Sequence, residues 1–120
     1  TQQHWVTHSD GLFLTYTRRG ANNDHVIRNR APLFIAQVDP ERLCVLRETE
    51  RILVPDKGAQ LGNFGALNAS PDESWVITSE GMHGDANDPM DLDLSESRGA
   101  DNRVWLARIV WNKTNRIVSH

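Results

Sequence analysis

The chain has little of several residue types, and each shortage narrows the class of protein. It has one cysteine, Cys44, in 120 residues, so no disulfide can form within the chain, and the apolar neighbours of Cys44 favour a small buried residue over a reactive thiol. No apolar run approaches the roughly 20 residues that a membrane-spanning helix needs, which predicts no membrane partner. The formal net charge is −3 and gives no electrostatic reason to expect nucleic acid as a partner.

A helical period is also lacking. From Trp5 onward the apolar residues fall in short runs, rich in β-branched and aromatic side chains, with turn-forming residues between them. This pattern is typical of short strands and predicts an all-β fold. The first half contains two hairpin-like pairs in succession, which together make a meander. Its four expected strands are His4–His8, Leu12–Thr17, Pro32–Val38 and Leu43–Val54.

The second half repeats the pattern of the first. Asp10 and Phe13 match Asp72 and Trp75 at one spacing, and the run 34–36 matches the run 105–107 at a larger spacing, because the loop between has grown. The four strands expected here are Phe64–Ala69, Ser74–Glu80, Arg103–Trp111 and Arg116–Ser119.

A four-stranded meander that recurs at a period of about 60 residues indicates the blades of a β-propeller. We expect residues 1–120 to be a single partial propeller domain of about two four-stranded antiparallel blades, one at about 4–54 and a second, complete or incomplete, at about 64–120. Because the chain begins with Thr1 rather than Met and reads as strand near its other end, we expect a fragment of a larger ring, whose remaining blades or self-association cover its open edges. The other interpretation is two unrelated hairpin pairs in one β-sandwich.

Alternate connections of a meander lie at opposite ends of the sheet, so the long connections share one end. These connections are Arg18–Ala31, Pro55–Asn63 and Gly81–Asn102. Long irregular loops are uncommon in compact domains unless they carry function, so the site is expected at this end.

The first of these loops holds the densest group of charged and polar residues. The planar fork of arginine binds carboxylates in two-pronged fashion, so an arginine cluster suits an anionic glycan that contains sialic or uronic acid. Asp24 and His25 supply side chains suited to proton transfer. The other interpretation is a solvated loop whose charges pair with Glu48, Glu50 or the acidic loop. The candidate substrate-binding residues are Arg18, Arg19, Asn23, Arg28 and Arg30.

The acidic loop from Asp85 to Asp93 is rich in the oxygen ligands that calcium prefers, but its spacing matches no known calcium loop. A solvated or disordered acidic loop is the alternative, and no other cofactor is expected. The four tryptophans lie on expected strands, where packing between blades is favoured over a role as sugar platforms.

The stretches His4–Leu14, Tyr16–His25 and Arg30–Phe34 resemble bacterial proteins of the sialidase-like superfamily with Asp-box-type repeats, and the resemblance covers most of residues 4–80. It implies a propeller with six or a similar number of blades, a glycosidase site at its centre, and a secreted or periplasmic location. The full Asp-box is absent, and its loose relative, Ser70–Trp75, is expected in a first-to-second turn rather than the usual third-to-fourth turn.

Sialidases use an arginine triad on the substrate carboxylate, a tyrosine nucleophile helped by a glutamate, and an aspartate as acid and base. By resemblance, Tyr16 is the candidate nucleophile and Asp24 the candidate acid and base, while Arg18, Arg28 and Arg30 are candidate members of the triad. Sialidase-like folds also host other functions, so three remain open. They are an exo-sialidase type of glycoside hydrolase, a uronate lyase that uses His25 or His8 with Tyr16 and an arginine, and a non-catalytic glycan-binding propeller.

Overall fold

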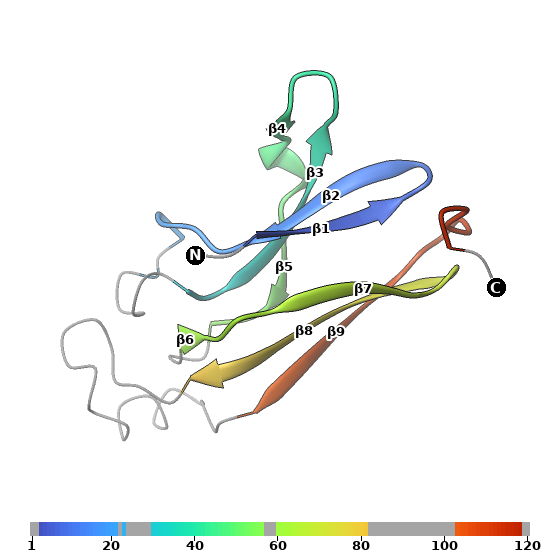
Figure 1. Ribbon diagram of the computed structural model, residues 1–120. Helices are drawn as coiled ribbons and strands as arrows, with labels where there is room; N and C mark the ends of the chain where they lie inside the picture. The colour runs from blue at the N-terminus through green and yellow to red at the C-terminus, as the bar shows by residue number, and fades with distance from the viewer. Residues whose placement is uncertain (1–2, 22, 24–29, 57–59, 82–102, 119–120) are drawn as a thin grey trace.

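The computed structural model describes residues 3–21, 23, 30–56, 60–81 and 103–118. These residues form two antiparallel β-sheets and no α-helix (Figure 1), which confirms the prediction of an all-β chain. No helix in this described part of the chain has the length and hydropathy needed to cross a membrane.

The first sheet is built on a meander of four strands in chain order. Each strand is antiparallel to the one before it: β1 (Gln3–His8), β2 (Gly11–Tyr16), β3 (Leu33–Asp39) and β5 (Arg51–Val54). The three strands expected first in the sequence agree with β1, β2 and β3 to within a residue or two. The alternation of buried and exposed side chains expected of a sheet is clearest in β3, where Leu33, Phe34, Ala36 and Val38 are buried.

The continuous strand expected over Leu43–Val54 is wrong. The structure instead has the short strand β4 (Cys44–Val45), one 3₁₀ turn, η2 (Arg47–Thr49), and then β5. Thr49 explains the interruption, because its Oγ1 accepts the Gln37 N–H at 2.8 Å and donates to the Leu46 carbonyl at 2.6 Å. A local side-chain bond of this kind competes with the ladder hydrogen bonds of a strand. Cys44 is exposed, whereas the sequence favoured a buried cysteine.

The second sheet has β8 (Glu73–Gly81) at its centre. β7 (Gly65–Ser70) pairs with one edge of β8 and β9 (Val104–Val110) with the other, while the short β6 (Gln60–Leu61) pairs with the far end of β8. The strands expected at Phe64–Ala69, Ser74–Glu80 and Arg103–Trp111 therefore correspond to β7, β8 and β9.

The expected strand at Arg116–Ser119 is wrong for its described residues, which form a turn. Asn115 turns the chain away from the sheet, because its backbone N–H donates to the Pro71 carbonyl at 2.7 Å. Its buried side chain accepts the Ser9 N–H at 3.0 Å and donates to the Thr7 carbonyl at 2.8 Å. The segment after β9 thus connects the β7–β8 turn to the β1–β2 turn and does not pair with β9 as a further strand.

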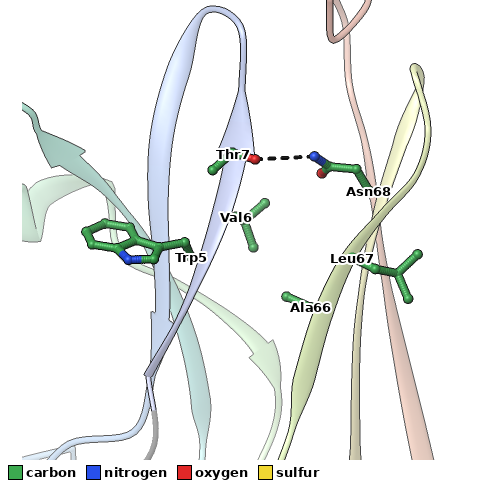
Figure 2. A pocket seen from close by; sticks show the side chains of 6 residues that line it. All are labelled: Trp5, Val6, Thr7, Ala66, Leu67 and Asn68. Atoms are coloured by element: carbon green, nitrogen blue, oxygen red, sulfur yellow. Dashed lines mark hydrogen bonds between the residues drawn. The ribbon is translucent and has the colours of Figure 1, made fainter. Parts of the chain in front are cut away.

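The two sheets pack face to face, with β1 against β7 and β5 close to β9 (Figure 1). At the β1–β7 seam, Asn68 donates a hydrogen bond to the Thr7 hydroxyl at 3.2 Å, and a pocket of about 120 Å³ lies beside this contact (Figure 2). The core between the sheets combines buried residues with partly buried aromatic ones. Its members include Val6, Leu33, Val54, Leu61, Phe64, Val76, Phe13, Ile35, Trp105, Ile109 and Trp111.

The two sheets are stacked head to tail. Ile35 packs into the core between the sheets, whereas its repeat counterpart, Leu106, points away from that core and is 47% exposed. The neighbouring pair shows the reverse, since Phe34 belongs to a separate cluster on the outer face of the first sheet while its counterpart, Trp105, packs into the core. Of two equivalent residues, one therefore faces the interface between the sheets and the other faces away from it. The second sheet is stacked on the first like the next member of a row, so that equivalent faces of the two sheets point in the same direction.

Candidate functional site

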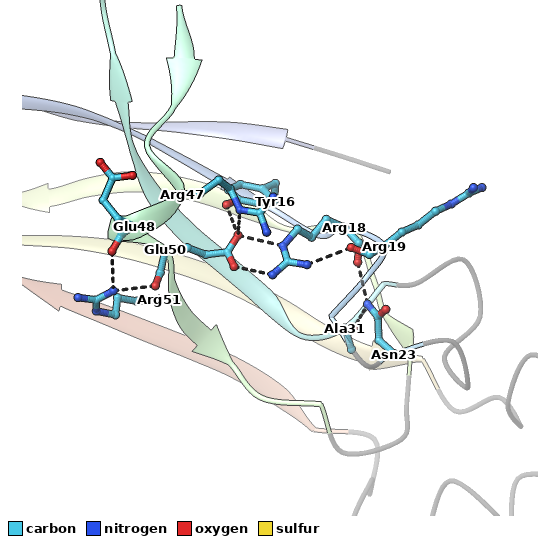
Figure 3. A network of polar contacts seen from close by, with 9 residues as sticks. All are labelled: Tyr16, Arg18, Arg19, Asn23, Ala31, Arg47, Glu48, Glu50 and Arg51. Atoms are coloured by element: carbon cyan, nitrogen blue, oxygen red, sulfur yellow. Dashed lines mark hydrogen bonds and ion pairs between the residues drawn. The ribbon is translucent and has the colours of Figure 1, made fainter.

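A cluster of four polar residues lies on the outer face of the first sheet, at the end of β2 (Figure 3). We call Tyr16, Arg18, Arg47 and Glu50 the Tyr16 cluster. The register places them together, because Tyr16 pairs with Phe34 and Phe34 pairs with Ile52. Glu50 precedes Ile52 by two residues and so shares its face of the sheet.

Glu50 is the centre of the cluster. Its carboxylate accepts hydrogen bonds from the Tyr16 hydroxyl at 2.5 Å, from Arg18 Nε at 3.0 Å and from Arg18 Nη2 at 2.7 Å. Arg47 adds an ion pair at 3.4 Å. The hydrogen bond from Arg18 is the main cause that holds the pKa of Glu50 below its ordinary value, so this carboxyl is ionised at neutral pH.

Tyr16 keeps its proton in this arrangement. Burial, followed by the hydrogen bond and negative charge of Glu50, raises the pKa of Tyr16 to about 12. The hydroxyl is thus a neutral donor aimed at a carboxylate, and Glu50 is the group placed to accept the proton if Tyr16 becomes a nucleophile.

Arg18 is fixed by three sets of contacts. Its guanidinium grips both oxygens of Glu50, its Nη1 donates to the Arg19 carbonyl at 3.0 Å, and its Cζ lies 4.7 Å from the centre of the Phe34 ring. For Arg18, the alternative interpretation of the loop is therefore the one observed, because its charge is paired with Glu50. Because the fork is already used on an internal carboxylate, Arg18 is placed to position Glu50.

Asn23 shapes the loop from within. It is fully buried, and its Nδ2 donates to the Arg18 carbonyl at 2.8 Å and to the Ala31 carbonyl at 2.7 Å. These bonds bring the two ends of the loop together beside the Tyr16 cluster (Figure 3). Asn23 thereby supports the geometry of the site.

Two further candidate arginines are placed differently from Arg18. Arg19 is exposed and its side chain points away from Glu50 (Figure 3). Arg30 has a buried Nε with no hydrogen-bond partner among the described residues, and it lines a small pocket with Thr17, Asn63 and other residues. A buried guanidinium nitrogen without a partner is costly, and the adjoining pocket, about 10 Å³ in volume, has room for about one water molecule.

Of the remaining candidates, the structure describes only His8. His8 lies at the opposite end of the β1–β2 hairpin from Tyr16, about 17 Å away at the usual rise per residue. One of its nitrogens contacts the Lys113 carbonyl at 2.8 Å and the other accepts the Asp10 N–H at 2.9 Å. The structure thus does not bring His8 to Tyr16. The other candidates, Asp24, His25, Arg28 and the loop Asp85–Asp93, lie outside the described residues.

Glu50 and Arg47 were missed as site residues in the sequence, where Glu50 appears only as a pairing partner. The signal that could find them is the register of the meander, which places the start of the last strand of the first sheet level with the end of its second. In the described part of the chain, no group of three or more histidine, cysteine or acidic side chains is placed to hold a metal ion.

No protein-family model matches this chain, and no curated protein or solved structure matches it either.

Proposed function

We propose that this chain contributes two adjacent blades to a sialidase-like β-propeller that hydrolyses or recognises an anionic glycan. The observation that carries the proposal is the 2.5 Å hydrogen bond between the Tyr16 hydroxyl and Glu50, with Arg18 gripping the same carboxylate. A tyrosine nucleophile helped by a glutamate is the arrangement that the resemblance implies, and here the two groups are in contact.

The stacking of the sheets supports the propeller. In a sandwich whose two equivalent sheets are related by a twofold axis, equivalent residues would face each other across the core. Here Ile35 faces the core, whereas its counterpart Leu106 faces away from it. Head-to-tail stacking also leaves an outer face on each sheet, and each outer face carries exposed apolar side chains beside its charged ones, as surfaces that meet a partner often do. Their exposed residues include Trp5 and Ile52 on the first sheet and Leu67, Ile77, Leu106 and Val110 on the second.

In the hydrolytic form of the proposal, Tyr16 Oη forms a bond to the anomeric carbon while the bond from that carbon to the leaving oxygen breaks. The tyrosine proton passes to Glu50, and Asp24, by resemblance, protonates the leaving oxygen. Water then attacks the anomeric carbon and gives a proton to Asp24, while the bond to Tyr16 Oη breaks and this oxygen recovers its proton from Glu50. Since the pKa of Tyr16 is about 12, its proton leaves only as the new bond forms, and Arg18 keeps Glu50 in line to receive it.

Arg30 is the described residue best suited to the carboxylate of the glycan. Its Nε is buried without a partner, and a carboxylate that reaches it as the adjoining pocket of about 10 Å³ widens on binding would satisfy it with a charge-assisted hydrogen bond. Arg19, exposed at the same end of the sheet, adds positive charge. Arg18 acts through Glu50 and is a positioning residue.

The binding half of the proposal is tested by titrating the isotope-labelled chain with sialic acid, glucuronic acid and the neutral sugar galactose. We expect the two acids to shift the nuclear magnetic resonance signals of Arg19 and Arg30, and galactose to leave them unchanged. Arg42 and Arg116 are internal controls, since each is paired with an aspartate, Asp39 and Asp10 respectively, in the short turns at the end of the sheets opposite the long connections. Equal responses to acid and neutral sugars, or equal shifts at the control arginines, would remove the anionic glycan from the proposal.

The catalytic half is tested on a panel of sialosides and uronate polymers, with released sugar and ultraviolet absorbance measured together. A propeller site is assembled from most of its blades, so these 120 residues should show no turnover by themselves. A longer protein that contains them should release sugar, and its Tyr16→Phe variant should not. Robust sialoside hydrolysis by the 120 residues would contradict the assignment as two blades, and an ultraviolet-absorbing product would indicate a lyase.

A further inference from the structure

The outer edge of β9 has backbone groups that no described strand uses. β9 pairs with β8 alone among the described residues. The Trp111 N–H donates to the Asp72 carbonyl and the Glu80 N–H to the Arg103 carbonyl, so the odd-numbered residues of this strand direct their backbone groups toward β8. In an antiparallel ladder the alternate residues direct theirs the other way. The residues that face the open edge are therefore Val104, Leu106, Arg108 and Val110.

This edge lacks the usual protection against pairing. Val104 is 73% exposed and Val110 is 67% exposed, and the strand contains neither proline nor lysine. Natural edge strands are commonly short, charged or interrupted, because a long apolar edge is a template for another strand. Arg108 is the one charged residue of β9, and its Nε is paired with Glu73 at 2.6 Å.

A groove beside the edge has the shape that an added strand requires. The meander of the first sheet has four strands, whereas β7, β8 and β9 face it with three, and β1 lies against β7. A groove of about 330 Å³ lies where β9 meets β3 and β5, and its apolar walls include Phe13, Ile35, Leu53, Ile109 and Trp111. A strand that paired with β9 would direct every second side chain into this groove.

The positive charge of Arg51 in the groove favours an added strand that carries a carboxylate. Arg51 lines it and forms no ion pair among the described residues, since its Nη1 donates to the Glu48 and Glu50 carbonyls. We propose that the β9 edge binds an extended polypeptide segment whose groove-facing side chains are apolar except for one carboxylate, which pairs with Arg51. This interaction surface is independent of the proposed glycan site.

A second copy of this chain fits the edge less well. Pairing β9 with its own copy about a twofold axis through Ala107, the centre of the strand, would place the two Arg108 side chains as diagonal neighbours, and like charges on neighbouring strands are unfavourable. A separate strand that carries a carboxylate avoids this conflict.

The test uses a capped synthetic peptide, Val-Thr-Val-Thr-Glu-Thr-Val, titrated into the isotope-labelled chain at millimolar concentrations. We expect saturable shifts at the amides of Leu106, Arg108 and Val110, slower hydrogen exchange there, and a dissociation constant on the order of 1 mM or lower. A peptide of the same sequence with its pairing amides methylated should not bind. A peptide with Lys in place of Glu should bind more weakly to the native chain, and this difference should vanish in an Arg51→Gln variant.

The matched variants are Leu106→Pro and Leu106→Val. Proline removes an N–H that faces the open edge and leaves the bonds to β8 intact, so affinity should fall at least about tenfold, whereas the valine variant should bind within about twofold of the native chain. The far-ultraviolet spectrum and thermal unfolding of each variant confirm that it is folded. Equal binding by the methylated peptide, equal binding by Leu106→Pro, or dimerisation through β9 in place of peptide binding would overturn the proposal.

Discussion

The Tyr16 hydroxyl donates a 2.5 Å hydrogen bond to the carboxylate of Glu50, 34 residues further along the chain. The bond favours the neutral phenol and the ionised carboxyl. It therefore helps to raise the pKa of Tyr16, where burial is the larger cause, and helps to lower the pKa of Glu50, where Arg18 is the larger cause. Each group stabilises the protonation state that the other requires, and this coupling is open to direct measurement.

The chain has one tyrosine, so its ultraviolet phenolate absorbance reports Tyr16 alone. The titration midpoint should lie near pH 12, compared with about 10 for a free tyrosine. Glu50→Gln should lower the midpoint only in part, because burial remains. Since the folded-state pKa is raised, the free energy of unfolding should be unaffected below about pH 10 and should fall as the pH rises from there toward 12. A midpoint near 10 in the folded chain would show that the pair is not formed.

Glu50 predicts the opposite behaviour in acid. Its folded-state pKa is depressed, so the unfolded chain takes up the proton first as the pH falls through the ordinary range of a glutamate, about 4.3. The free energy of unfolding should decline below that pH, and Glu50→Gln should remove part of the decline. Glu41→Gln is the matched control, since this glutamate is exposed. Chemical denaturation from neutral pH to pH 3 measures the difference, and identical pH profiles for the two variants would contradict it.

Changing Arg18 to alanine and changing Arg30 to alanine should have different effects on stability and on ligand affinity. Arg18→Ala removes charge-assisted bonds to Glu50, so the free energy of unfolding should fall by about 1–3 kcal/mol. Arg30→Ala removes a buried nitrogen without a described partner, whose burial is itself unfavourable, so the free energy of unfolding should not fall. If Arg30 binds the glycan carboxylate, sialic acid affinity should fall roughly tenfold in that variant. Thermal unfolding and ligand titration of both variants test this, and the reverse order of effects would exchange their roles.

Asn115 should be a point of weakness between the sheets. Asn115→Ala deletes the bonds to the Ser9 N–H and the Thr7 carbonyl and leaves these groups unpaired, which should cost about 2–3 kcal/mol. Arg116→Ala, which removes only an exposed ion pair with Asp10, should cost less than about 1 kcal/mol. Equal losses in the two variants, measured by chemical denaturation, would mean that the segment after β9 does not join the sheets.

The exposed apolar side chains on the outer faces of the two sheets should cause the chain to associate in solution. Ile77 is 39% exposed at the centre of the outer face of the second sheet. Ile77→Lys should reduce concentration-dependent association in sedimentation experiments. Ser79→Lys, on the same strand and the same face, is the matched control and should have a smaller effect. A strictly monomeric native chain that unfolds cooperatively at high concentration would favour a self-contained sandwich.

The strands that alternate regularly could be predicted from the sequence, and the irregular ones could not. β1, β2 and β3 follow from alternation and turn residues alone. The break between β4 and β5 depends on a bond between Thr49 and Gln37, and the turn at the end of the chain depends on Asn115 reaching Thr7, 108 residues away. Such contacts do not appear in a local pattern. In the site, the arginine-rich loop was visible, but its partner Glu50 required the register of three strands.

The head-to-tail stacking of the two sheets bears on how such a protein can lengthen during evolution. A contact of this kind joins two different faces of a repeated unit, so every unit carries both halves of the interface. A duplicated gene segment therefore encodes a unit whose two faces already match its neighbours. Substitutions can afterwards adjust each contact separately, because a side chain such as Ile35 meets only the sheet on its own side.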